Sequence, residues 1–133
     1  MKVAIYARTA TTQNNKPAKS VQNQIDRLTN YAKENGHSIS GVYYDVASGN
    51  DFNRSQFGQM LHDIETGDKK IRMIICTSSD RFSRSLLKAV ELLHKLLKAG
   101  VEIKFIDDTP ADIEFRRIES EIIGSYYKSK KKK

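Results

Sequence analysis

A five-residue segment near the middle of the chain, Asp80-Arg81-Phe82-Ser83-Arg84, carries one carboxylate and two guanidinium groups. It closely follows an apolar run, residues 71–76, that indicates a buried β-strand. Two like charges held this close together repel each other unless an anion lies between them. A guanidinium group donates two parallel hydrogen bonds and stays charged at physiological pH, which suits phosphate. The segment therefore predicts an oxyanion or phosphodiester site.

Cations and polar side chains at two other predicted strand ends extend this site. Arg8 follows an apolar run at residues 2–7, and Arg54 follows the loop after the second predicted strand. Together with the two arginines of the central segment, they could surround one phosphodiester and neutralise the charge of its transition state. Asp80 could orient the arginines or move a proton, and Gln24 could hydrogen-bond to the same group.

Each of these charged residues could instead form an ordinary surface ion pair, such as Asp80 with Arg84 near a helix start. Such pairs are common and contribute little, so a single charged residue is a weak signal. Because charged residues follow three different predicted strands, a shared phosphate-binding site is favoured over separate ion pairs. The histidines His37, His62 and His94 are far apart and lack metal-ligand spacing, so we expect no metal site and no cofactor.

The elements that would position these residues alternate along the chain. Apolar runs indicate strands at residues 2–7, 39–44, 71–76 and 101–106. Apolar residues at helical spacing indicate helices that start near Ser20, Phe57, Leu86 and Pro110, the first three ended by Gly36, Gly67 and Gly100. We therefore expect a single α/β domain with a mostly parallel sheet of four to five strands flanked by helices. Ligands of such sheets bind at the carboxyl ends of the strands, where all three charged clusters fall.

The chain of 133 residues is long enough for one domain with its own core. We expect a core at residues 1–110, a short C-terminal oligomerisation helix at 111–128 and a basic tail at 129–133. The formal charge of +7 favours a polyanion such as DNA as the partner, but five of the 23 basic residues lie within 128–133. Without them the excess falls to +2, and the tail could equally be a solubilising end.

Targeting features are missing from the sequence. No apolar run approaches the roughly 20 residues that cross a bilayer, and the first residues do not resemble a signal peptide. Cys76 is the only cysteine and is expected to be a buried strand residue, so no internal disulfide can form. These features predict a cytoplasmic protein without a membrane partner.

Four spaced motifs resemble those of the serine recombinases, the resolvase and invertase family. The family has Tyr-Ala-Arg-x-Ser-Thr near its start, then Ser-Ile-x-x-Gln, then Asp-x-x-Ser-Gly followed by an arginine, and finally Asp-Arg-Leu-x-Arg. The matching stretches here are Tyr6-Ala7-Arg8-Thr9-Ala10-Thr11, Ser20-Val21-Gln22-Asn23-Gln24, Asp45-Val46-Ala47-Ser48-Gly49 with Arg54, and Asp80-Arg81-Phe82-Ser83-Arg84. The match runs in order from Lys2 to about Pro110.

This resemblance implies a resolvase-like catalytic domain for site-specific DNA recombination, which cuts and rejoins DNA through a 5′-phosphoserine link without metal. It implies that subunits act as dimers or higher oligomers. The implied phosphate-binding and catalytic residues are Arg8, Arg54, Asp80, Arg81 and Arg84, with Gln24 and Ser48 in support and Ala10 at the position of the nucleophile.

The sequence departs from the family in three places. Ala10 stands where the family has its serine and cannot form a phosphoester, so the chain as given is expected to be inactive in strand cleavage. Thr9 and Thr11 should point away from the direction of residue 10 in an extended strand. The last predicted helix is shorter than the family's oligomerisation helix, and no DNA-binding domain follows. Ala10 could be an introduced change or a natural loss.

Two other functions stay open. A natural non-catalytic module that dimerises or regulates an active recombinase would keep the fold without the chemistry. Such a module is favoured by the short last helix, which should leave Phe115, Ile118 and Ile122 exposed and so predicts at least a dimer. A flavodoxin-like nucleotide-binding or receiver domain is disfavoured, because Thr9-Ala10-Thr11-Thr12 replaces a glycine-rich phosphate loop. The sequence does not identify a target DNA site.

Overall fold

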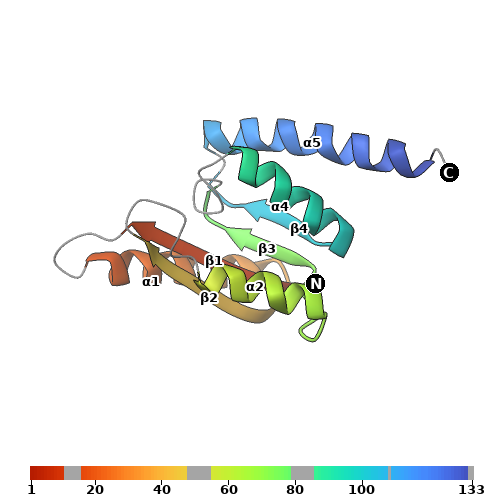
Figure 1. Cartoon of the computed structure of the whole chain (residues 1–133). Helices are drawn as coiled ribbons and strands as arrows, with labels where there is room; N and C mark the ends of the chain where they lie inside the picture. The colour runs from red at the N-terminus through yellow and green to blue at the C-terminus, as the bar shows by residue number, and fades with distance from the viewer. Residues whose placement is uncertain (11–15, 48–54, 79–85, 108, 132–133) are drawn as a thin grey trace.

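Four parallel strands form one sheet with helices on both faces (Figure 1). The computed structural model describes residues 1–10, 16–47, 55–78, 86–107 and 109–131. The strands lie in the order β2-β1-β3-β4 and span β1 (Lys2–Ala10), β2 (Ser38–Ala47), β3 (Met73–Cys76) and β4 (Glu102–Phe105). The helices are α1 (Lys16–Glu34), α2 (Ser55–Thr66), α4 (Leu86–Ala99) and α5 (Pro110–Lys131). The predicted α/β fold with a parallel sheet is confirmed, with four strands in the described residues.

The central strand β1 is buried on both faces. Its residues from Val3 to Ala7 are all fully inaccessible to solvent. A continuous apolar run of this kind is typical of a parallel strand covered by helices on both sides. Alternate side chains of β1 therefore serve two different cores.

The two faces of the sheet pack against different helices. Val3 and Ile5 of β1 pack with Leu28 and Ala32 of α1 on one face. Ala4 and Tyr6 belong to the opposite face, whose core is completed by α2, α4 and α5. The members from these helices are Phe57, Met60, Ile64, Leu93, Leu96 and Phe115. Burial of apolar surface on both faces is the main stabilising contribution to the sheet.

The predicted helix ends are confirmed. Gly36, Gly67 and Gly100 have left-handed backbone angles, with φ of 71°, 74° and 73°. At the end of α1 the N–H of Gly36 donates to Lys33 and the N–H of His37 donates to Ala32, which satisfies two of the last helical carbonyls. The helices α1, α2 and α4 therefore stop where glycine permits this turn.

The start of α1 differs from the prediction. The helix begins at Lys16, four residues before Ser20, the predicted cap. Pro17 explains the difference, because proline is well tolerated in the first turn of a helix, where its missing N–H has no partner to lose. The first strand is also longer than predicted and continues to Ala10, which pairs with Ala47 of β2.

Helix α5 starts at Pro110, as predicted, and its first turn is capped. The hydroxyl of Thr109 accepts the N–H of Asp112 at 3.2 Å, and the Asp112 carboxylate accepts the N–H of Thr109 at 2.9 Å. This reciprocal pair satisfies two main-chain donors at the helix start. The helix continues to Lys131 and so extends three residues into the stretch expected as a basic tail.

The predicted exposure of the last helix is wrong for Phe115. This side chain is buried and meets the ring of Phe105 edge-on, with centroids 5.0 Å apart. Ile118 and Ile122 are half-buried. The exposed apolar side chains of α5 are instead Ile113 and Tyr127. In the described part of the chain, no helix is long and apolar enough to cross a membrane.

Candidate functional site

The strand order changes direction at β1. The crossover through α1 leads from β1 to β2 on one side, and the crossover through α2 leads back across β1 to β3 on the other. The two crossover helices lie on opposite faces of the sheet. In open α/β sheets a ligand crevice forms at this point, beyond the carboxyl ends of the two strands. We call the space beyond the ends of β1 and β3 the crevice.

The two strands that border the crevice are paired with each other over only part of their length. Their described pairing ends at Ile5 and Ile75, whereas β1 stays paired with β2 as far as Ala10. The main-chain groups of Arg8 on the β3 side therefore need another partner.

Gln24 of α1 is that partner. Its side-chain Oε1 accepts the N–H of Arg8 at 3.3 Å, and its Nε2 donates to the carbonyl of Arg8 at 3.0 Å. The amide thus takes the place of a neighbouring strand. Gln24 is buried and lies on the same face of α1 as Val21 and Leu28, so its position is fixed by the core. The predicted site residues Arg8 and Gln24 are brought together, through the main chain of Arg8.

Asp45 fixes a second border of the site. Its carboxylate accepts the hydroxyl of Tyr6 at 2.8 Å and the N–H groups of Gln56 and Phe57 at 3.0 Å each. Asp45 therefore caps α2 from a neighbouring strand, and the positive end of the helix stabilises its charge. Asp45 also lies beside Arg8 in the strand register.

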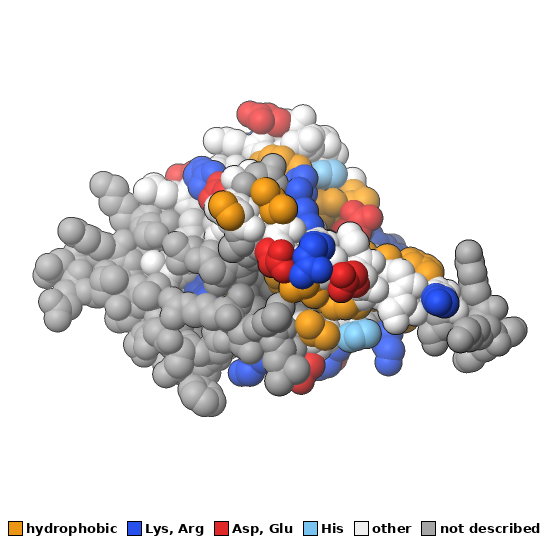
Figure 2. All heavy atoms as spheres, turned by 90° about the horizontal axis from the view of Figure 1, so that it is seen from above, with side chains coloured by type: hydrophobic (Ala, Val, Ile, Leu, Met, Phe, Trp, Pro, Cys, Tyr) orange, Lys and Arg blue, Asp and Glu red, His pale blue; other side chains and the backbone are white. Residues whose placement is uncertain are grey.

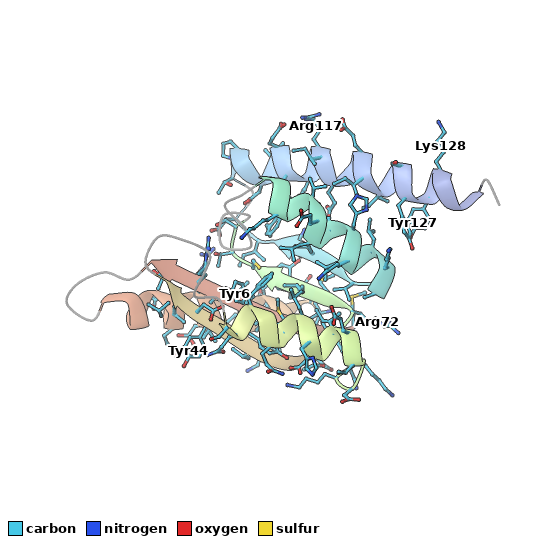
Figure 3. All side chains as sticks on the ribbon, viewed as in Figure 1. Tyr6, Tyr44, Arg72, Arg117, Tyr127 and Lys128 are labelled. Carbon is cyan, nitrogen blue, oxygen red and sulfur yellow. The ribbon has the colours of Figure 1, made fainter. Side chains whose placement is uncertain are left out.

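Tyr6 and Asp45 were not predicted as site residues, although each is the first residue of one of the four motifs quoted above. Tyr6 lies in the interior of the molecule (Figure 3), where its ring meets Phe57 edge-on at 5.0 Å. The signal that could have identified them is a buried carboxylate and a buried hydroxyl at neighbouring strand positions, since each needs a polar partner. Together they fix the first turn of α2, which follows Arg54 in the sequence.

Arg8 is itself buried, with 4% of its surface exposed, at the carboxyl end of β1. A buried guanidinium group is stable only with anionic or hydrogen-bonding partners. Thr9 and Thr77 are also buried at the ends of β1 and β3. The described residues at the carboxyl ends of β1 and β3 therefore include buried polar side chains and one buried cation, Arg8.

The other predicted site residues fall largely outside the described part of the chain. These residues are Ser48, Arg54, Asp80, Arg81 and Arg84. The main chain of Ala10 is described and forms the last residue of β1. Among the described residues, no group of three His, Cys, Asp or Glu side chains is placed to hold a metal ion.

Comparison with known proteins shows that the chain is similar to resolvases. The chain is 31% identical over 107 residues to a resolvase from Clostridium perfringens, covering 80% of this chain and 50% of the relative. It is 29% identical over 108 residues to the transposon Tn3 resolvase of Escherichia coli, covering 81% and 51%. The chain thus spans about half the length of the curated relatives it matches.

Solved structures share the fold. The N-terminal catalytic domain of TP901-1 integrase superposes with a TM-score of 0.74 and 28% identity, covering 98% of this chain and 99% of that one. A resolvase family site-specific recombinase from Streptococcus pneumoniae has a TM-score of 0.74 at 22% identity, covering 99% and 89%. A family model described as the N-terminal domain of resolvase matches residues 3–130, and the chain therefore belongs to the resolvase family.

Proposed function

We propose that this chain is the catalytic domain of a site-specific DNA recombinase, and that the crevice binds the scissile phosphodiester. The observation that carries the proposal is the position of Arg8. In a member of the resolvase family, this buried cation lies at the carboxyl edge of the sheet with its main chain held by Gln24. A fixed guanidinium group at a strand end suits the equatorial oxygens of a phosphoryl group in transfer.

The proposed chemistry requires a hydroxyl at position 10. A serine there would attack the phosphorus, and a new O–P bond would form as the 3′-oxygen of the neighbouring nucleotide leaves. Arg8, with Arg54, Arg81 and Arg84, would neutralise the charge that develops on the phosphoryl oxygens. Asp80 would orient the arginines or carry a proton, and Ser48 would support phosphate binding. The methyl group of Ala10 offers no nucleophile, so the chain as given binds without cutting.

The direct test is Ala10→Ser. Incubation with a pool of randomised DNA duplexes should give a protein–DNA adduct that survives denaturing electrophoresis, whereas the parent chain gives none. The matched control carries Arg8→Gln as well as Ala10→Ser and should lose the adduct, because the phosphoryl charge is no longer balanced. Absence of an adduct from a correctly folded Ala10→Ser protein, on DNA that it demonstrably binds, would contradict the proposed cleavage.

A second candidate function, a dimerising module, is favoured by the charge pattern of α5. Its first half, from Asp112 to Glu121, holds four acidic residues and two arginines and so has a net charge of −2, and its lysines lie in the last turns, from Lys128 onward. Figure 2, which looks down on this side of the molecule, shows charged side chains beside hydrophobic ones. Two copies of α5 packed in opposite directions would match acidic halves with basic halves.

Gly124 would allow two copies of α5 to pack closely. It lies near the middle of the charge pattern, is exposed, and has no atom within 4 Å of the position that a Cβ would take. Glycine inside a helix costs about 1 kcal/mol relative to alanine, which a close helix–helix contact would offset. Figure 3 shows Tyr127 and Lys128 projecting from the same end of this helix. We infer that α5 mediates self-association.

Gly124→Leu tests this contact. The substitution should weaken self-association about tenfold or more in sedimentation velocity, because the side chain separates the helices. Gly58→Leu, at an exposed glycine of α2, is the matched control and should leave the sedimentation unchanged. A parent chain that stays monomeric at high concentration would contradict the module. The adduct test with Ala10→Ser is independent of this result and decides only the catalytic proposal.

A further inference from the structure

The segment after β4 is bonded to two different parts of the molecule. The N–H of Asp107 donates to the carbonyl of Thr77 at 2.9 Å, just beyond the end of β3. The carboxylate of Asp107 forms an ion pair with the guanidinium group of Arg27, which is 80 residues away in sequence on α1. Asp107 therefore joins the exit of β3 to α1.

Arg27 lies one helical turn after Gln24, the residue that holds the main chain of Arg8. Leu28, the next residue, is fully buried against the sheet, so this turn of α1 packs directly on the strands. A continuous set of contacts thus leads from Arg8 through Gln24, along one turn of α1, and through the Arg27–Asp107 pair to Thr77. It joins the carboxyl end of β1 to the residue after β3 by way of α1, beyond the point where the described pairing of β1 with β3 has ended.

We propose that Arg27 and Asp107 are a positioning pair, which sets the separation between the carboxyl ends of β1 and β3 and thereby the width of the phosphate site. The inference rests on the proposed function of the crevice. Neither side chain has to touch the phosphate. Their effect is transmitted by Gln24, whose two hydrogen bonds fix the main chain of Arg8.

The exposure of the pair makes it easy to test. The side chains of Arg27 and Asp107 are 54% and 29% exposed. Ion pairs with this exposure contribute little to global stability, so removal of either partner should leave the fold intact. A change in phosphate binding can then be separated from unfolding.

A rival explanation is that Arg27 contacts DNA directly. The two explanations predict opposite signs for Asp107→Asn. Loss of a negative charge should by itself strengthen binding to a polyanion. Loss of a positioning residue should weaken it, because Arg8 and the end of β3 are no longer held at a fixed separation.

The first experiment measures binding of a fluorescent DNA duplex as a function of salt. Arg27→Gln and Asp107→Asn should each weaken binding by about threefold, with an unchanged dependence on salt. The double variant should be no weaker than either single variant. The exchanged pair, Arg27→Asp with Asp107→Arg, should recover affinity. Tighter binding by Asp107→Asn, or a salt slope reduced by about 0.9 in Arg27→Gln, would overturn the proposal.

A second experiment does not depend on DNA. Amide hydrogen exchange should become a few-fold faster at Arg8 and Asp107 in Arg27→Gln. Gln22→Ala is the matched control, because Gln22 is exposed on the same helix and donates a hydrogen bond to Asp26 of that helix. Unchanged exchange at Arg8 in Arg27→Gln would refute the positioning role. A parent chain that fails to bind DNA would refute the proposed function, and the exchange result would still decide the role of the pair.

Discussion

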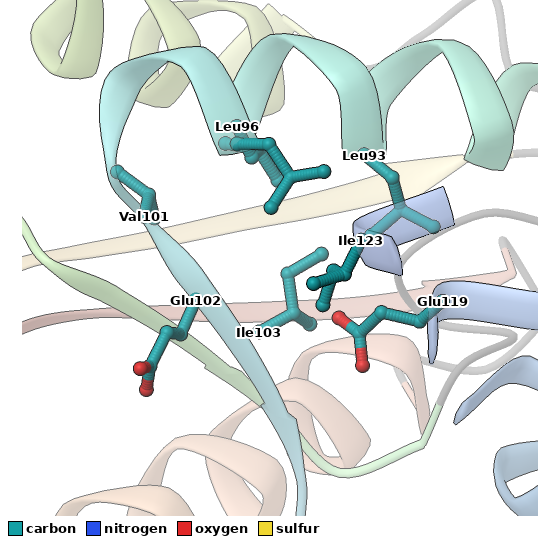
Figure 4. A pocket seen from close by; sticks show the side chains of 8 residues that line it. Leu93, Leu96, Val101, Glu102, Ile103, Glu119 and Ile123 are labelled. Atoms are coloured by element: carbon teal, nitrogen blue, oxygen red, sulfur yellow. The ribbon is translucent and has the colours of Figure 1, made fainter. Parts of the chain in front are cut away.

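The crevice at the carboxyl edge of the sheet and the space beneath α5 are lined by different kinds of side chain. In the crevice, both main-chain groups of Arg8 are satisfied by Gln24, and Asp45 satisfies three donors nearby. Beneath α5 there is a cavity of about 270 Å³, bordered by α4, β4 and α5. We call this cavity the α5 hollow; its labelled lining residues are shown in Figure 4.

The lining of the α5 hollow is aliphatic apart from two acids. Leu93, Leu96 and Ile103 contribute to its walls, and Glu102 and Glu119 add carboxylates from β4 and α5. Figure 4 shows Glu119 approaching from α5 beside the aliphatic side chains. At the carboxyl edge the buried side chains of Gln24 and Asp45 are hydrogen-bonded, whereas under α5 a carboxylate lies beside aliphatic side chains. The two regions therefore differ in how their polar groups are partnered.

The largest expected loss of stability comes from Asp45→Ala, at the hydrogen-bonded carboxyl edge of the sheet. The substitution leaves the Tyr6 hydroxyl and two N–H groups of α2 without their acceptor, at a cost of about 3 kcal/mol in the free energy of unfolding. Urea unfolding followed by circular dichroism measures it. Asp26→Ala, at an exposed carboxylate that accepts from Gln22, should stay within about 0.5 kcal/mol. A loss below about 1 kcal/mol in Asp45→Ala would show that the carboxylate is not essential to the capping.

A smaller effect is expected from Gln24→Ala, which removes both partners of the Arg8 main chain. Two net hydrogen bonds and a small cavity amount to about 2 kcal/mol. Because the lost contacts are at the site, DNA affinity should fall along with stability. Gln22→Ala, on the exposed side of the same helix, should change neither quantity. Equal stability of the two variants would mean that water replaces the amide at Arg8 without loss.

The order of elements was predictable because each rests on a local signal. Continuous apolar runs predicted the strands. Three glycines predicted the helix ends, and the structure gives each of them a left-handed backbone angle. The position of Arg8 at a strand end follows from the same pattern. The start of α1 was missed because the tolerance of Pro17 in a first helical turn outweighed the capping tendency of Ser20.

The contacts that define the site were less predictable, since they depend on how distant elements separate or pack. Gln24 reaches the Arg8 main chain only because β3 diverges from β1. Asp45 caps a helix that begins ten residues later, across the intervening loop. The burial of Phe115 depends on the angle at which α5 meets β4, which no local pattern specifies.

The smallest expected effect on stability concerns the α5 hollow and arises from the titration of Glu119. Burial raises the pKa of this carboxyl above its ordinary value of 4.5; the charge of Arg116 lowers it and that of Glu102 raises it again. Because the folded-state pKa is the higher one, the stabilising contribution of the protonated carboxyl is complete below pH 4.5 and is lost as the pH rises through the folded pKa.

Glu119→Gln should therefore stabilise the folded chain at pH 7 by less than about 1 kcal/mol, since the group is partly exposed and screened, and should have little effect at pH 4. Urea midpoints with equal slopes at the two pH values measure the difference. Glu121→Gln, which only loses an exposed pair with Arg117, should show no such gain at pH 7. If Glu119→Gln is destabilising at pH 7, the attraction between the carboxylate and Arg116 outweighs the cost of burying its charge.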